Sequence, residues 1–272
     1  MGTKRFIIAS LLGIAISLPS MAQIDDDISN FGVWTSIGVE KKISKKWGVE
    51  FEGEFRTADA LNEVSRYSLG ISTDYKLTSW LKADAGYVFL RDHNLKSFRE
   101  DPIAEEDEGW VIQQGELTDA YWTSRHRFNV SLVGNVKLDR FKISLRERWQ
   151  YTYRQETSKY ETDYVFYDSE STLPSVDGPT EKTVKSKGSN VLRSRLQVAY
   201  DIKSVPFEPY ASVELYNDFD GFKIKKTRYT IGGDYKIAKK HSIGLYYRYQ
   251  DFSGSDEGES THILGVGYKF KF

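Results

Sequence analysis

Apolar and polar residues alternate along the last thirteen residues of the chain, Ser260 to Phe272. One set of alternate positions is apolar and the other is mostly small or charged: Leu264, Val266, Tyr268, Phe270 and Phe272 alternate with Ile263, Gly265, Gly267, Lys269 and Lys271. A period of two indicates a β-strand with two different faces. Such a strand, ending on an aromatic residue, is typical of the closing strand of a bacterial outer-membrane β-barrel.

The same alternation recurs along most of the chain. Eleven segments are expected to be strands: 31–43, 47–57, 64–77, 80–91, 120–138, 140–155, 190–203, 207–217, 222–237, 240–252 and 260–272. Most are longer than the roughly 9–11 residues that a tilted strand needs to cross a bilayer. The predicted fold is therefore all-β, an antiparallel transmembrane β-barrel of about 10–12 strands. Because bacterial single-chain barrels have even strand numbers, we expect about 10 or 12, with Ile24–Asn30 either adding a short strand or passing through the lumen.

Two kinds of connection separate these segments. Short turns are expected near 44–46, 78–79, 139–140, 203–206 and 238–240, and longer connections at about 92–119 and 156–189, with others near 58–63, 218–221 and 253–259. Outer-membrane barrels have short periplasmic turns and longer external loops, which places Phe272 on the periplasmic side. The long connections are acidic, as in Glu105–Glu108. We interpret them as solvated loops, with divalent-cation bridging to surface lipids as the alternative.

The beginning of the chain has the features of a secretory signal peptide. Lys4 and Arg5 precede an apolar run from Phe6 to Leu18, and Ser20-Met21-Ala22 places small residues at the −3 and −1 positions. We therefore expect a signal peptide over residues 1–22, cleavage before Gln23 and an outer-membrane barrel over 23–272. The expected location is the outer membrane of a Gram-negative cell. The expected partners are outer-membrane lipids and the barrel-assembly machinery.

Composition excludes a helical membrane protein and agrees with a barrel. Mean hydropathy is −0.53, 28% of residues are charged, and 14% are aromatic. No apolar stretch of about 18 residues is present. A barrel combines an apolar outer face with a polar lumen, and it needs no disulfides, in agreement with the absence of cysteine. Nothing in the composition points to a nucleic-acid partner.

Charged residues on the inward register of the predicted strands are the candidate functional residues. Lumen-lining positions are expected at Glu50, Glu52, Glu54, Arg125, Arg127, Arg146, Arg148, Arg193, Arg195, Glu214, Arg228 and Arg248. One interpretation is that these charges pair and fill a narrow lumen. The other is a path for a small polar solute, since guanidinium groups suit carboxylate or phosphate. The first makes the chain a structural or surface-interaction barrel with a plugged lumen, and the second a small channel or passive uptake barrel.

An enzymatic role has weaker support in the sequence. The four histidines are His93, His126, His241 and His262. Ser124 shares a strand face with His126, but two strand residues separate their Cα atoms by roughly 6–7 Å. No G-x-S-x-G, H-E-x-x-H or glycine-rich phosphate loop is present. We expect no catalytic residues, cofactor or metal, and a lipid-modifying activity is the third hypothesis.

Several short motifs together resemble a family of Bacteroidota outer-membrane barrels of unknown function. They are Phe31–Trp34, the first hairpin from Glu40 to Trp47, the Arg66-Tyr67 pair and Tyr268–Phe270. The resemblance covers essentially the whole chain after the signal peptide. It implies the location and the fold, and it carries over no catalytic or ligand-binding residues because its motifs build the barrel.

Overall fold

The computed structural model describes residues 30–101, 111–167, 175–219, 221, 223–253 and 260–272. The predicted signal peptide, 1–22, and the segment Ile24–Ser29 lie outside the described residues. Within the described part, no helix is long and apolar enough to cross a membrane. Fifteen strands are present there: β1 (Phe31–Lys42), β2 (Trp47–Ala58), β3 (Glu63–Lys76), β4 (Leu81–Asn94), β5 (Ser97–Asp101), β6 (Val111–Thr118), β7 (Tyr121–Leu138), β8 (Phe141–Arg154), β9 (Thr157–Tyr167), β10 (Ser175–Val184), β11 (Lys187–Tyr200), β12 (Phe207–Asp218), β13 (Ile224–Ala238), β14 (His241–Phe252) and β15 (Thr261–Lys271).

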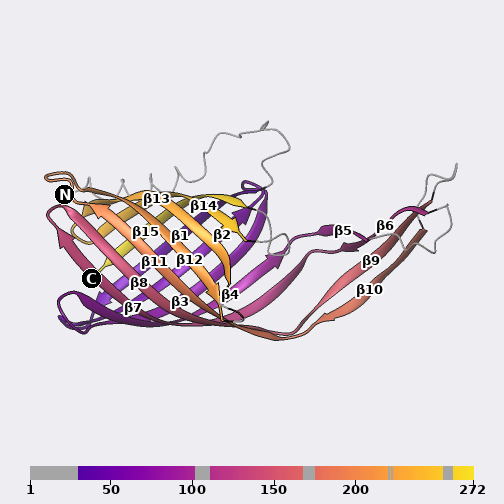
Figure 1. The fold of residues 1–272 in the computed structure, drawn as a ribbon, viewed down its shortest axis with the longest axis horizontal. Helices are drawn as coiled ribbons and strands as arrows, with labels where there is room; N and C mark the ends of the chain where they lie inside the picture. The colour runs from indigo at the N-terminus through magenta and orange to yellow at the C-terminus, as the bar shows by residue number, and fades with distance from the viewer. Residues whose placement is uncertain (1–29, 102–110, 168–174, 220, 222, 254–259) are drawn as a thin grey trace, which may run out of the picture.

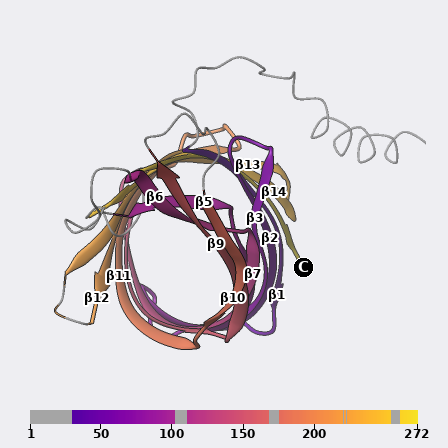
Figure 2. The ribbon, with the colours of Figure 1, turned by 90° about the vertical axis from the view of Figure 1, so that its right-hand side faces the viewer.

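Eleven of the strands form a closed barrel, as Figures 1 and 2 show. Their order around the barrel is β1-β15-β14-β13-β12-β11-β8-β7-β4-β3-β2. The eleven barrel strands match the eleven predicted segments, so the all-β barrel prediction is confirmed. The expectation of an even number was wrong. Each connection reverses the direction of the chain, so after eleven strands β1 and β15 run the same way and pair in parallel, from Phe31↔His262 to Glu40↔Lys271.

Alternation along each strand separates an inward polar face from an outward apolar face. On β3, Leu69 is 70% exposed to the outside, whereas its neighbour Ser68 is 8% exposed. The outward positions of other barrel strands are also large and apolar, including Ile37, Phe51, Val130, Leu145, Leu196, Ile231 and Leu245. Such a surface is unstable in water and stable in lipid, because exposed apolar area is favourable only next to hydrocarbon.

Short turns close one end of the barrel, and the chain ends there. Ser44 Oγ accepts hydrogen bonds from the backbone N–H groups of Lys46 and Trp47, and Thr78 Oγ1 does the same for Trp80 and Leu81. At the same end, the N–H of Phe272 donates to the carbonyl of Glu40 at 3.0 Å. The predicted short turns and the position of Phe272 beside them are thus present.

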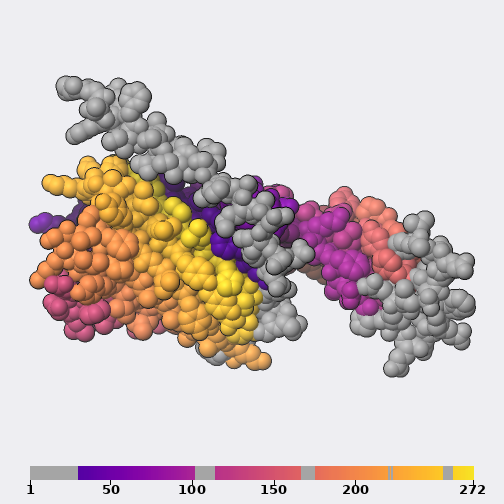
Figure 3. All heavy atoms as spheres, turned by 90° about the horizontal axis from the view of Figure 1, so that it is seen from above, coloured from indigo at the N-terminus to yellow at the C-terminus, as the bar shows by residue number. Residues whose placement is uncertain are grey.

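The two longest predicted connections are not plain loops. They contain β5, β6, β9 and β10, which form a separate four-stranded sheet in the order β10-β9-β6-β5. This sheet projects from the end opposite the short turns, as Figures 1 and 3 show. Its central pair joins β6 to β9, from Thr118↔Glu161 to Val111↔Tyr167. Sequence patterns miss this sheet because its central pair, β6 with β9, joins segments that are far apart in the chain.

Candidate functional site

The barrel encloses a cavity of about 910 Å³ whose wall is mostly charged. Fourteen basic and seven acidic side chains line it, so positive charge exceeds negative charge twofold. Because side chains alternate along a strand, every second residue of the barrel strands contributes to this wall. The whole chain has a formal net charge of −1. The excess of positive charge is therefore a property of the lumen wall and does not reflect the composition of the whole chain.

All twelve residues expected to line the lumen lie on the wall of this cavity. They come from seven strands: Glu50, Glu52 and Glu54 on β2, Arg125 and Arg127 on β7, Arg146 and Arg148 on β8, Arg193 and Arg195 on β11, Glu214 on β12, Arg228 on β13 and Arg248 on β14. The acidic triplet on β2 lies away from β8 and β11 in the order of strands around the barrel.

Four arginines form a block on the neighbouring strands β8 and β11. Arg148 pairs in register with Arg193, and Arg146 with Arg195. Like charges directly opposite each other on a sheet repel and destabilise it. The block therefore depends on acidic side chains from neighbouring strands, and the structure supplies two of them.

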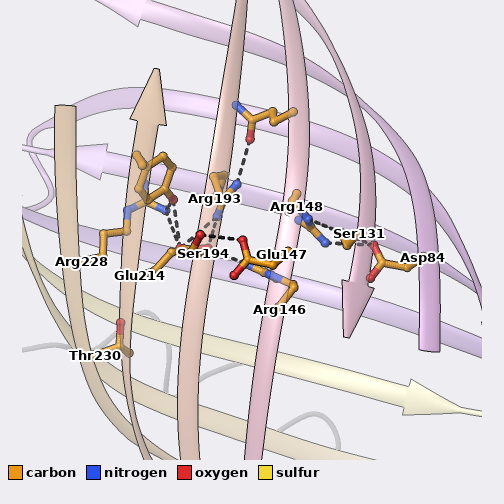
Figure 4. A network of polar contacts seen from close by, with 12 residues as sticks. Asp84, Ser131, Arg146, Glu147, Arg148, Arg193, Ser194, Glu214, Arg228 and Thr230 are labelled. Carbon is orange, nitrogen blue, oxygen red and sulfur yellow. Dashed lines mark hydrogen bonds and ion pairs between the residues drawn. The ribbon is translucent and has the colours of Figure 1, made fainter. Parts of the chain in front are cut away.

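Glu214 on β12 is the first of these acids, and it binds three arginines at once (Figure 4). Arg193 Nη2 donates to Glu214 Oε1 at 3.0 Å and to Oε2 at 3.1 Å, while Arg146 Nη2 donates to Oε1. Arg228 Nη1 lies 3.9 Å from Oε2. The Glu214 residue is only 6% exposed, so these interactions occur largely out of water.

Asp84 on β4 is the second acid, and the sequence analysis did not select it. Arg148 Nη2 lies 3.2 Å from Asp84 Oδ1, and Arg148 Nε donates to Ser131 Oγ at 2.8 Å. Ser131 Oγ in turn donates to Asp84 Oδ1 at 2.8 Å, which closes a three-membered network (Figure 4).

A third network lies nearer the projecting sheet and joins residues from three strands. Asp92 on β4 binds Arg66 on β3, and Arg125 Nε on β7 lies 3.0 Å from the other carboxylate oxygen. That last contact is an ion pair without hydrogen-bond geometry, since both atoms are without a hydrogen-bond partner. Arg66 and Asp92 were also missed, although each continues the inward register of its strand.

Aromatic rings hold several of the remaining cations. The guanidinium carbon of Arg56 lies 3.5 Å from the ring centroid of the buried Trp34, and Arg248 and Arg228 approach the same ring at 5.1 and 5.3 Å. The ring of Tyr216 is approached by Lys226 at 4.4 Å, Arg193 at 4.5 Å and Arg228 at 4.7 Å. These distances are typical of cation–π contacts.

A second cavity, of about 650 Å³, opens at the end with the short turns. Six lysines line it: Lys142, Lys236, Lys239, Lys240, Lys269 and Lys271. Ser36, Glu52, Tyr246 and Lys269 line both cavities, so the two adjoin there. Tyr246 lies flat over Gly265, where a Cβ atom would be 1.9 Å from the tyrosine ring. Glycine at position 265 thus leaves room for the tyrosine ring at the junction of the two cavities.

The histidines all have partners of other kinds. Tyr87 pairs with His126 through Nδ1 at 2.7 Å, whereas Ser124 accepts a hydrogen bond from Arg91 at 2.7 Å. His241 and His262 each bond a tyrosine hydroxyl, and His93 bonds the carbonyl of Val64. The Ser124–His126 pair considered in the sequence therefore does not form. The structure adds nothing to the lipid-modifying hypothesis at these residues.

Comparison with known proteins assigns the chain to a family. The model of the family described as "Protein of unknown function (DUF2490)" matches residues 31–261, and the chain belongs to that family. The match does not extend to a bacterial phylum, so an origin in Bacteroidota stays a prediction. No curated protein matches the sequence.

Solved structures similar to this one are barrels. The β-domain of the Bordetella autotransporter BrkA has a TM-score of 0.50 and 14% identity, with 83% of each chain covered. The translocator domain of the autotransporter NalP from Neisseria meningitidis has a TM-score of 0.49 and 11% identity, covering 82% of this chain and 74% of that one. The monoaromatic hydrocarbon channel CymD has a TM-score of 0.35 and 8% identity, covering 80% of this chain and 82% of that one. At such identities, the BrkA likeness supports the fold alone.

Proposed function

We propose that this protein is a passive outer-membrane channel for small polar solutes, with a preference for anions. The observation that carries the proposal is the larger cavity, whose wall has fourteen basic and seven acidic side chains. It adjoins a second, lysine-lined cavity at the end with the short turns. Together the two cavities, which share Ser36, Glu52, Tyr246 and Lys269, would form the polar route of such a channel.

The outer membrane is the location that best fits the apolar outer surface. Isoleucine, leucine, valine and phenylalanine side chains 40–70% exposed encircle the barrel, among them Leu69, Phe51 and Ile231. A closed barrel satisfies all backbone hydrogen bonds between strands, which is a requirement for crossing a bilayer. The predicted signal peptide supports export, and short turns at one end support a periplasmic position for that end.

Electrostatic focusing explains how such a lumen would favour anions. A passage lined by one sign of charge, with low-dielectric walls, raises the local concentration of the opposite ion. Arg195 has no ion pair among the described residues, and Arg148 has one with Asp84. The positive charge of Arg195 therefore acts on a passing ion at short range, where salt screens it least.

Ion selectivity in a planar bilayer tests this proposal. Purified protein should pass chloride more readily than potassium at low ionic strength, and the preference should weaken as salt rises. The double substitution Arg148→Gln and Arg195→Gln removes two positive charges from the wall and exposes Asp84, so the preference should fall or reverse. As a matched control, Arg99→Gln with Arg140→Gln removes two charges from residues outside both cavities and should leave selectivity unchanged.

The alternative is a structural or surface-interaction barrel whose lumen is plugged by its own charges. Its support is the set of cross-strand networks centred on Glu214, Asp84 and Asp92, which place large side chains inside the barrel. The projecting sheet would then be the functional surface. On that sheet, the hydrogen bond from Lys159 lowers the pKa of the Glu161 carboxyl and so favours its ionised form. Absence of any conductance by the wild-type protein would favour this alternative over the channel.

A further inference from the structure

Several cations of the lumen have no carboxylate partner among the described residues, and two of these lie toward the projecting sheet. They are Arg127 on β7 and Lys226 on β13, and both line the larger cavity. Within the described residues, Arg127 has one hydrogen bond, from Nε to Thr152 Oγ1 at 3.4 Å. In the same described part of the chain, Lys226 Nζ lies beside two rings, 4.4 Å from the centroid of Tyr216 and 5.1 Å from that of Phe252. Each side chain is thus held in place while its charge remains uncompensated.

The contrast with the neighbouring arginines shows why this matters. Arg66 and Arg125 share the carboxylate of Asp92, and Arg193 and Arg228 share that of Glu214. A carboxylate cancels the charge of its partner, whereas an aromatic ring orients a cation and leaves its full charge. A cation without an opposite charge in a lumen of lower effective dielectric than bulk water attracts an anion strongly, so an anion binding there is stabilised.

Further positive charge converges on the same two residues. Arg56, Arg66 and Arg193 each repel both Arg127 and Lys226 through space. These five side chains come from β2, β3, β7, β11 and β13, so the charge surrounds this part of the lumen. The Nε atom of Arg193 is also buried without a hydrogen-bond partner among the described residues, which leaves a donor for an incoming oxygen.

We propose that this half of the lumen is a binding site for a small polyanion, held between Arg127 and Lys226. Two uncompensated cations on different strands favour a solute with at least two negative charges. Guanidinium forks and an ammonium group suit phosphate or carboxylate oxygens. The cavity volume of about 910 Å³ lies within the range of about 300–1,000 Å³ for small-molecule sites. This inference rests on the proposed function, since it names the class of solute that the channel would select.

Competition between chloride and a polyanion tests the site. Inorganic pyrophosphate or citrate, added to purified protein in a planar bilayer, should reduce the chloride current reversibly. Arg127→Gln and Lys226→Gln should each weaken this block by about tenfold, the effect of losing one charge-assisted contact. Lys82→Gln is the matched control, because it removes the same charge from the same cavity near the short turns, where Lys82 pairs with Asp74 at 3.9 Å. It should leave the block within about twofold of wild type.

Binding by calorimetry separates the failure of this site from the failure of the channel. If the wild-type protein conducts and prefers chloride but neither polyanion blocks or binds, the site is refuted and the channel remains. If the protein binds pyrophosphate without conducting, the channel is refuted and the site remains. Equal loss of block in the Lys82→Gln control would also refute the site, because overall charge would then explain the effect. Relative strength of pyrophosphate and citrate distinguishes phosphate from carboxylate recognition.

Discussion

At the scale of single residues, Glu214 has the largest structural role in the lumen. One carboxylate is shared by Arg146, Arg193 and Arg228, and Tyr216 donates a further hydrogen bond to it at 3.1 Å. Without Glu214, the in-register arginines of β8 and β11 would face each other with less compensation. Glu214, which is one of several lumen charges in the sequence, therefore links β12 to β8, β11 and β13.

Replacing Glu214 by glutamine should destabilise the barrel by about 3 kcal/mol, because removing one partner of a buried ion pair leaves uncompensated charges. Urea-dependent folding into lipid vesicles measures this. The control is Glu147→Gln on β8, since Glu147 is exposed on the outside and, among the described residues, accepts a single hydrogen bond, from Ser194 Oγ at 2.6 Å. That substitution should cost less than about 1 kcal/mol. Equal effects of the two substitutions would show that Glu214 has no special role.

At the scale of elements, the junction of β1 and β15 is a parallel pair in a barrel whose other strand pairs are antiparallel. Parallel pairs have slanted hydrogen bonds and are slightly less stable per residue than antiparallel pairs. The end of this junction is reinforced by Phe272. Its N–H donates to Glu40, its carbonyl accepts from Lys42 at 3.3 Å, and its ring stacks on Phe270 with centroids 5.7 Å apart. Lys41 Nζ lies 5.1 Å from the same ring.

Deleting Phe272 should lower the yield of folded barrel more than it harms a barrel that has already closed, because the residue helps to form the junction. Heat-modifiable gel mobility reports the folded fraction. Phe272→Leu is the comparison that keeps the two backbone hydrogen bonds and removes only the aromatic ring. A normal folded yield after the deletion would contradict the account.

The barrel strands were predictable from sequence and the projecting sheet was not. The alternation of apolar residues at Tyr67, Leu69 and Ile71 is enough to identify that strand, because apolar residues face the lipid and polar residues face the lumen at alternate positions. The strands β6 and β9 depend on each other instead, although more than forty residues separate Val111 from Thr157. The parallel junction was missed although eleven segments were identified, because an even strand number was expected and no local pattern indicates parallel pairing.

In the lumen, too, the sequence predicts which residues point inward but not which side chains pair with one another. The inward register identified Arg127 and Arg193 together, yet only Arg193 has a carboxylate partner. Which cation is compensated depends on side chains reaching across strands that are distant in sequence. Asp84 and Arg66 could have been found by extending the inward register of their strands, whereas the role of Tyr216 in holding Lys226 required the structure.

At the scale of the whole molecule, charge is separated between the lumen and the rest of the chain. The chain has 38 basic and 39 acidic residues, but the wall of the larger cavity has fourteen basic and seven acidic ones. Net charge alone would therefore describe a neutral protein. The barrel sorts this charge so that a positive interior lies within an apolar shell, and that arrangement is the physical basis of the proposed anion path.

Chemical access to Ser36 tests most directly whether this path is continuous and favours anions. Ser36 lines both cavities, and the sequence contains no cysteine, so Ser36→Cys introduces a single reactive thiol at their junction. The account predicts that a negatively charged thiol reagent modifies this position faster than a positively charged reagent of similar size, from either side of the membrane. Faster reaction with the positive reagent, or no reaction from either side, would contradict it.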